Sequence, residues 1–154
     1  MSAETAASES HKADISMRQV NKIIIHCSAT VEGRDYTVAQ IRDWHVKGNG
    51  WKDIGYHFVI YRDGTVHTGR DINQIGAHTS GQNTGSISIC YVGGLAADGK
   101  TPKDTRTDEQ KKALRALVDR LCQQYGISHR QVYGHNEFAA KACPCFDVKK
   151  EFRV

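Results

Sequence analysis

The sequence predicts a single α/β domain with a central mixed β-sheet flanked by α-helices. Short β-branched runs alternate with segments of helical periodicity along the chain. One pair of runs flanks an Asp-Gly turn and predicts an antiparallel hairpin, whereas strands joined through helices are expected to be parallel. The length of 154 residues is that of one ordinary domain with a substantial core.

The first two predicted elements are a strand and a helix. KIIIHCSAT (Lys22–Thr30) is continuous and β-branched, which indicates a buried strand. Thr37 and Gln40 form a capping box ahead of apolar residues at helical spacing. Gly48 is expected to end this helix.

A hairpin and a further strand follow. YHFVIYRDGTVHTGR (Tyr56–Arg70) contains two aromatic and β-branched runs around Asp63-Gly64, a strong turn signal. SISICYVGG (Ser86–Gly94) predicts a strand that its glycine pair stops.

The clearest helix begins after a capping box of Thr107 and Gln110 and ends at Gly126. QVYGH (Gln131–His135) predicts a short final strand. The apolar face of the helix is formed by Leu114, Leu117, Val118, Leu121, Cys122 and Tyr125.

Residues 1–16 differ from the rest of the chain. They are rich in Ala, Ser and Glu and have no apolar centre, so we expect a disordered extension ahead of a domain at residues 17–154. The extension lacks the features of a signal peptide, which predicts a protein made in the cytoplasm without one. No apolar run approaches the ~20 residues that a membrane helix needs.

The composition excludes few partners by itself. The net charge of +4 is not gathered in one block, and it favours an anionic partner only weakly. Neither an RNA-binding aromatic signature nor zinc-finger spacing is present, so we expect no nucleic acid and no membrane partner.

The segment GHNEFAAKACPCFD (Gly134–Asp147) holds the densest group of reactive side chains. Its Cys143-Pro144-Cys145 suggests half of a zinc site, a disulfide corner or a redox motif. The chain has five cysteines at irregular spacing and no export signal, so metal ligation or simple burial is favoured over a disulfide framework. A redox motif would normally have two residues between its cysteines.

His26 and His135 lie at or just past the ends of predicted strands, where α/β sheets place their ligand sites. Zinc binds imidazole nitrogen and thiolate sulfur, and a catalytic zinc ion has three protein ligands and one open position. The spacing alone leaves open whether His26, His135 and Cys143 form a zinc site or are unrelated buried residues. His78 lies in a Gly- and Ser-rich loop, where a polar ring contacts ligand more often than core.

Four segments, in order and at family spacing, resemble the zinc-dependent N-acetylmuramoyl-L-alanine amidases of the type 2 family. The resemblance is greatest to the small phage enzymes, and the peptidoglycan recognition proteins are more distant relatives. It runs from about Lys22 to Phe152. The segments are IIIHCSAT, IRDWHVKGNGWKDIGYHFVIYRDGTVHTGRD, IGAHTSGQNTGSISICYVGG and GHNEFAAKACPCFD.

The resemblance implies a fold, an activity and a set of site residues. It implies a Zn²⁺ cofactor, a peptidoglycan (muropeptide) substrate, and hydrolysis of the amide between N-acetylmuramic acid and L-alanine. The expected setting is a phage or prophage endolysin that acts on the wall after release, or a secreted effector, and we expect a monomer. By position, the metal ligands are His26, His135 and Cys143, the catalytic residues are Tyr56 and Lys141, and the substrate cleft is bordered by His78 and Asn83.

The chemistry of these residue types agrees with an amidase. Zinc can activate water and polarise a carbonyl, and a phenol and an ammonium group can stabilise the charge that develops. Taken alone, Tyr56 would be a packing residue of the hairpin and Lys141 a solvated loop residue.

Two points stay open at this level. The family commonly has Ser or Gly where this chain has Cys145, a second thiol that can replace Cys143 as ligand, form a disulfide or have no role. The alternative function is a non-catalytic peptidoglycan-binding module, although such relatives typically lack the cysteine ligand.

Overall fold

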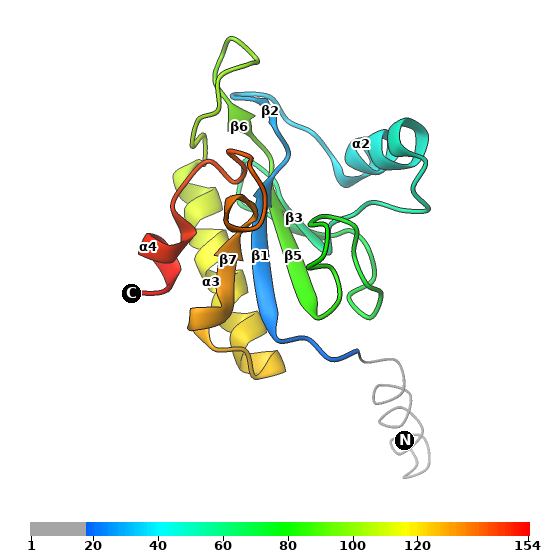
Figure 1. Cartoon of the computed structure of the whole chain (residues 1–154). Coiled ribbons are helices and arrows are strands. Elements are labelled where there is room, and N and C mark those ends of the chain that lie inside the picture. Colours follow the sequence, from blue (N-terminus) through cyan, green and yellow to red (C-terminus); the bar gives the residue numbers. More distant parts are fainter. Residues whose placement is uncertain (1–17) are drawn as a thin grey trace, which may run out of the picture.

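The computed structural model describes residues 18–154, and its centre is a five-stranded sheet in the order β4-β3-β5-β1-β7 (Figure 1). The β3–β4 pair is antiparallel and the other three pairs are parallel, which confirms the predicted mixed sheet. The predicted extension at residues 1–16 lies outside the described residues. The strands are β1 (Lys22–Cys27), β3 (Phe58–Ile60), β4 (Val66–Thr68), β5 (Ser86–Tyr91) and β7 (Val132–Gly134).

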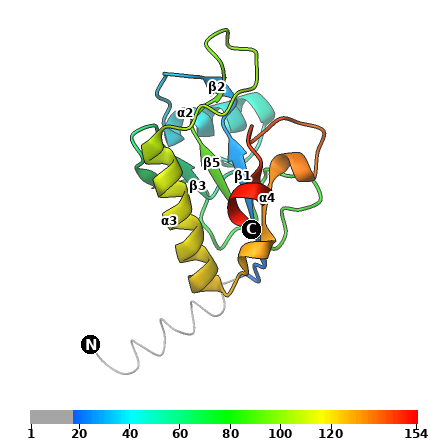
Figure 2. The same cartoon turned by 90° about the vertical axis from the view of Figure 1, so that its left-hand side faces the viewer.

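Helix α3 (Asp108–Tyr125) lies across one face of the sheet, as Figures 1 and 2 show. Its apolar side packs on Ile23 and Ile25 of β1 and on Ile87 and Ile89 of β5, which form the main core. Because successive side chains of a strand point to opposite faces, Val59 lies on the other face from Phe58 and Ile60. Val59 packs there with Ile41 of α2 (Val38–Asp43). Within the described residues, no helix has the length and apolar character needed to cross a membrane.

The helix boundaries follow the predicted signals. Thr37 and Thr107 both cap their helices through the predicted capping boxes with Gln40 and Gln110. Gly126 ends α3 in the left-handed conformation, at φ +66°. Helix α2 continues without a break into a π-helical segment (Trp44–Gly48), which the sequence pattern does not distinguish from an α-helix.

Two predicted strands are shorter than expected. The strand at 22–30 ends at Cys27 and the strand at 86–94 ends at Tyr91, because Ala29, Gly93 and Gly94 adopt positive φ angles. The chain resumes as β2 (Thr30–Val31) and β6 (Gly94–Leu95), which pair in a separate parallel ribbon. The unpredicted helix α4 (Val148–Phe152) is too short to show periodicity, and its Val148 and Phe152 complete the core.

A buried arginine ties the segment around Cys143 to the rest of the fold. The side chain of Arg106 is 3% exposed and pairs with Asp104 at 2.9 Å and with Glu151 of α4 at 2.8 Å. Its guanidinium group also lies over the ring of Phe146, 3.4 Å from the centroid. Burial opposes ionisation of Asp104, but the hydrogen bonds and charge of Arg106 lower the pKa of this carboxyl group below its ordinary value.

We expect Arg106→Ala to lower the free energy of unfolding by about 3 kcal/mol, the lower end of the range for breaking a buried ion pair, because both carboxylates keep access to solvent. Urea denaturation at pH 7 measures the loss. A lowered carboxyl pKa adds stability above the unfolded-state pKa and loses it as pH falls through the folded-state value, so the difference should shrink in acid. The control is Arg62→Ala, which breaks an exposed pair with Asp35 and should cost less than about 1 kcal/mol. Equal losses in the two variants would contradict the prediction.

Candidate metal centre and active site

The two histidines at the strand ends meet because their strands are neighbours. Strands β1 and β7 are parallel, and Ile25 is in register with Gly134. The next residue of each strand is therefore at the same edge of the sheet, and these residues are His26 and His135. Their ring centroids lie 4.6 Å apart.

Cys143 completes the group from the loop that precedes α4. One nitrogen of each histidine and the Cys143 Sγ atom lie within 4.8 Å of one another. The Nδ1 atom of His26 is the one that faces the sulfur, at 3.9 Å. The backbone N–H of Cys27 donates to the same sulfur at 3.2 Å, and the Tyr91 hydroxyl group holds the loop by donating to the Pro144 carbonyl group at 2.7 Å.

This donor set fits a zinc ion. Zinc–nitrogen and zinc–sulfur bonds together span up to about 4.4 Å, so one ion can bind both Nδ1 of His26 and Sγ of Cys143, which lie 3.9 Å apart. Burial, followed by the charges of His78, His135 and Lys141, lowers the pKa of His26 well below its ordinary value. Burial and Lys141 likewise lower the pKa of His135. Both imidazoles are thus held in the neutral form that binds metal.

Cys145 lies outside this group. Its backbone has φ +70°, and its Sγ atom donates to the Gly94 carbonyl group at 3.4 Å and lies 4.0 Å from the Sγ atom of Cys27. Within the described residues all five cysteines are free thiols. The geometry therefore favours Cys143 over Cys145 as the sulfur ligand.

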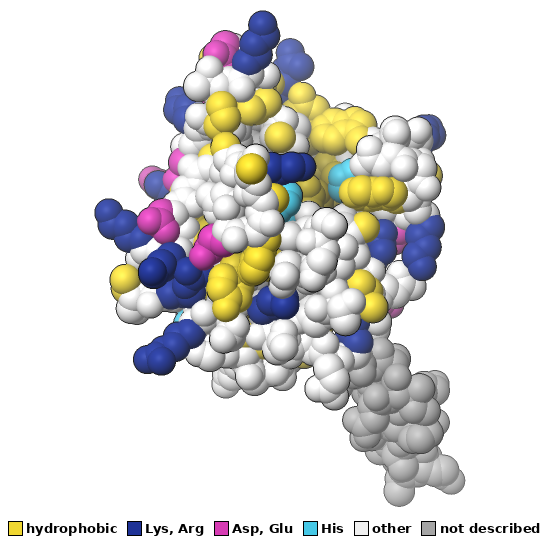
Figure 3. Space-filling view, viewed as in Figure 1, with side chains coloured by type: hydrophobic (Ala, Val, Ile, Leu, Met, Phe, Trp, Pro, Cys, Tyr) yellow, Lys and Arg dark blue, Asp and Glu magenta, His cyan; other side chains and the backbone are white. Residues whose placement is uncertain are grey.

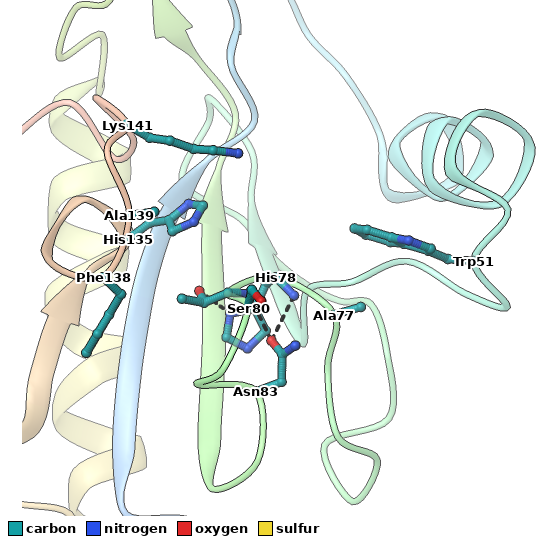
Figure 4. Close-up of a pocket in the computed structure, with 10 residues that line it drawn as sticks. Trp51, Ala77, His78, Ser80, Asn83, His135, Phe138, Ala139 and Lys141 are labelled. Atoms are coloured by element: carbon teal, nitrogen blue, oxygen red, sulfur yellow. Dashed lines mark hydrogen bonds between the residues drawn. The ribbon is translucent and has the colours of Figure 1, made fainter.

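Tyr56 and Lys141 flank the three donors. The ring of Tyr56, just before β3, lies 5.1 Å from the ring of His26. Burial raises the pKa of the Tyr56 phenol well above its ordinary value, which keeps its proton in place for donation. Lys141 is exposed, and Figure 4 shows its side chain extending beside the ring of His135. The positive charge of Lys141 is close enough to lower the pKa of both His26 and His135.

A pocket of about 470 Å³ opens beside these side chains. In Figure 3, histidine side chains are visible in a depression of the surface, with a basic side chain next to them. Trp51 faces His135 and Lys141 across the pocket (Figure 4). The lining residues are Trp51, Ala77, His78, Thr79, Ser80, Asn83, His135, Phe138, Ala139 and Lys141.

His78 and Asn83 both line the pocket, but most of their hydrogen-bonding atoms are already engaged. Both ring nitrogens of His78 have partners, with Nδ1 2.9 Å from Nε2 of His26 and Nε2 3.1 Å from Oγ of Ser86. The Oδ1 atom of Asn83 accepts from the backbone N–H groups of His78 and Thr79 at 3.0 and 2.9 Å, drawn as dashed lines in Figure 4. Asn83 therefore holds the loop that carries His78.

Sequence reasoning missed the aromatic part of the pocket. Trp51, in a Gly-rich loop, is 37% exposed, and Phe138, from the segment that follows His135, lines the opposite side of the pocket (Figure 4). The available signal in the sequence was a tryptophan in a Gly-rich stretch shortly before Tyr56. His45 accepts a hydrogen bond from the Gly55 N–H at 2.9 Å and packs against Trp51, with ring centroids 4.8 Å apart.

Comparisons with known proteins give consistent results. The family model described as N-acetylmuramoyl-L-alanine amidase matches residues 16–146. The chain is 44% identical to the endolysin of Klebsiella phage KP32 over 133 residues, covering 86% of this chain and 85% of that protein. Among solved structures it is similar to N-acetylmuramoyl-L-alanine amidase LysC from Clostridium intestinale, at 28% identity and TM-score 0.72, covering 89% of this chain and 87% of that one. It is also similar to a mutant of Drosophila PGRP-LB in complex with tracheal cytotoxin, at 27% identity and TM-score 0.68, covering 83% and 76% of the two chains.

Proposed function

The chain belongs to the N-acetylmuramoyl-L-alanine amidase family, and on that premise we propose that His26, His135 and Cys143 hold the zinc ion of its active site. The protein is a peptidoglycan amidase of the phage endolysin type, a conclusion supported by its endolysin relatives and by amidases of similar structure. The observation that carries the proposal is the meeting of these three donors beside one pocket.

The bond to be cleaved determines which catalytic groups the site must contain. Hydrolysis of the amide between N-acetylmuramic acid and L-alanine needs an activated water molecule and stabilisation of negative charge on the carbonyl oxygen. When bound, zinc supplies Lewis acidity that activates water and polarises the carbonyl group. Two neutral imidazoles and one thiolate leave such a site a net charge of about +1, which preserves that acidity.

Tyr56 and Lys141 supply the remaining groups in this proposal. The phenol of Tyr56 keeps its proton because burial raises its pKa, so it can donate a hydrogen bond to the carbonyl oxygen as charge grows there. The ammonium group of Lys141 faces the same space and stabilises that charge, or donates a proton to the leaving amine of L-alanine.

The pocket beside the donors is the proposed site of the muropeptide. The apolar side chains of Trp51 and Phe138, on opposite sides of this pocket, suit packing against a sugar or alanyl group, and we expect His78 and Asn83 to border the bound substrate. Proteins of similar fold bind tracheal cytotoxin, which supports a ligand of the peptidoglycan type for this chain. The proposed place of action is cell-wall peptidoglycan, reached after release from the cytoplasm. A monomeric state stays a prediction.

Metal removal tests the proposal. Purified protein is incubated with peptidoglycan, with and without a chelator, and new amino termini and new reducing ends are counted. We expect release of L-alanine amino groups without new reducing ends, loss of that release with chelator, and recovery when zinc is added back. Peptidoglycan binding without any release by the zinc-loaded protein would instead identify a recognition module.

A further inference from the structure

A chain of hydrogen bonds runs from His26 away from the metal donors. The Nε2 atom of His26 lies 2.9 Å from Nδ1 of His78, whose Nε2 atom lies 3.1 Å from Oγ of Ser86. The chain ends at the carbonyl oxygen of Asn83, 3.2 Å from Oγ of Ser86. His26 and Ser86 are buried, at 1% and 0% exposure, whereas His78 and Asn83 between them are partly exposed at the pocket.

The end of the chain determines where the protons lie. A carbonyl oxygen can only accept, so the Ser86 hydroxyl group donates to Asn83. The Ser86 oxygen then accepts from the ring of His78, which places the proton of neutral His78 on Nε2 and leaves Nδ1 as an acceptor. The Nε2–H group of His26 fills that acceptor, so the Nδ1 atom of His26 carries no proton.

The bare Nδ1 atom of His26 is the atom that faces Cys143 Sγ at 3.9 Å. The opposite arrangement would protonate this atom and block it as a metal ligand. It would also cost the Asn83 carbonyl group its hydroxyl donor and leave it only the longer contact with the backbone N–H of Ser86, at 3.4 Å. Thr79, 2% exposed, has its hydroxyl oxygen 3.3 Å from Nε2 of His26 and 3.0 Å from Nδ1 of His78. Its oxygen can accept from the Nε2–H group of His26, which is compatible with the same arrangement.

We propose that His78 is a positioning residue that sets the tautomer and the ring orientation of His26, so that Nδ1 of His26 is presented to the metal ion. The proposal rests on the zinc site of the proposed function. It gives His78 a role through His26, and it explains why both of its ring nitrogens are turned to protein groups although the residue lines the substrate pocket.

The loop around His78 is built to hold this position. The side chain of Asn83 accepts from the backbone N–H groups of His78 and Thr79, so the residue that closes the hydrogen-bond chain also fixes the loop. Groups that orient a metal-binding histidine typically change metal affinity by about 10–100-fold when they are removed. The effect of His78 should therefore appear first in zinc binding.

The test measures zinc affinity and activity separately. His78→Leu, which fills the space without an acceptor, should bind zinc about 10–100-fold more weakly than the wild type in competition with a chromophoric chelator. His78→Asn, whose Oδ1 atom can accept near the position of Nδ1, should recover most of that affinity. The matched control is His129→Leu, since His129 is exposed and pairs with Asp119 instead; it should bind zinc like the wild type.

Activity as a function of zinc distinguishes positioning from substrate contact. We expect the activity of His78→Leu to be low at limiting zinc and to return towards the wild-type value at saturating zinc, with little change in KM. A loss that saturating zinc does not restore, or zinc affinity within two-fold of the wild type, would overturn the proposal. Urea unfolding of the metal-free proteins separates a loss of fold from a loss of metal affinity.

Ser86→Ala provides a second route if His78→Leu does not fold. Removing the hydroxyl group frees His78 to carry its proton on Nδ1, so we expect zinc affinity to fall by about 10-fold. Unchanged affinity in this variant would overturn the proposal. Wild-type protein that binds zinc but releases no L-alanine amino groups would contradict the proposed function, yet the effect of His78 on zinc affinity would still be measurable.

Discussion

Cys143→Ala is expected to abolish both zinc binding and amidase activity, whereas Cys145→Ser should retain both. The Sγ atom of Cys143 faces the His26 ring and accepts from the Cys27 N–H group, a setting suited to a thiolate ligand. Loss of a group that hydrogen-bonds to a metal ligand typically lowers metal affinity by about 10–100-fold. Removal of the ligand itself should lower zinc affinity by more than that. Zinc content after dialysis and release of L-alanine amino groups are the two measurements.

The Cys145→Ser variant is a close control because it lies two residues away in the same loop. Its Sγ atom points to the Gly94 carbonyl group, and a serine hydroxyl group can donate there as well. We therefore expect full zinc content and activity near the wild-type value. Loss of zinc in Cys145→Ser together with its retention in Cys143→Ala would reverse the ligand assignment.

The sequence predicted the positions of the two histidines for a physical reason. A β-branched run and the short strand at 132–134 both end at a histidine, and parallel neighbours bring their carboxyl ends to one edge of the sheet. The main helix was equally predictable, because its capping box and C-terminal glycine act locally. Local signals such as these do not depend on the rest of the fold.

The choice between the two sulfurs was not predictable in this way. Cys143 and Cys145 share a loop without periodicity, and the directions of their side chains depend on the loop's backbone and on anchors from distant elements, Tyr91 and Arg106. The ribbon of β2 and β6 was missed for a similar reason, since two-residue strands leave no pattern.

The hydrogen-bond chain behind His26 likewise depends on tertiary structure. A loop position far along the chain brings His78 to His26, and the sequence indicated only that a polar ring in a Gly- and Ser-rich loop tends to contact ligand. The structure directs the ring nitrogens of His78 to His26 and Ser86 instead. Proximity to the pocket and contact with substrate are thus separate properties of a residue.

Tyr56→Phe and Lys141→Met should each lower kcat by about 10²–10³-fold while zinc stays bound, the loss typical of one donor to a developing oxyanion. Phenylalanine keeps the ring that packs 5.1 Å from His26, and methionine keeps most of the length of Lys141 without its charge. The measurement is kcat and KM on a soluble muropeptide at saturating zinc. A rise in KM at unchanged kcat would assign the residue to substrate binding instead.

The controls for this pair lie away from the pocket. Tyr36→Phe alters a tyrosine that packs on Trp44, with ring centroids 5.2 Å apart, and Lys47→Met alters an exposed lysine paired with Asp43 at 3.6 Å. Neither residue lines the pocket beside the metal donors, so both variants should keep wild-type kcat. We propose that Tyr56 and Lys141 act on the same developing charge. Their effects should then not add, and the double variant should lose less than the product of the two single losses. Additive losses would mean that the phenol and the ammonium group serve separate steps, with Lys141 then acting on the leaving amine.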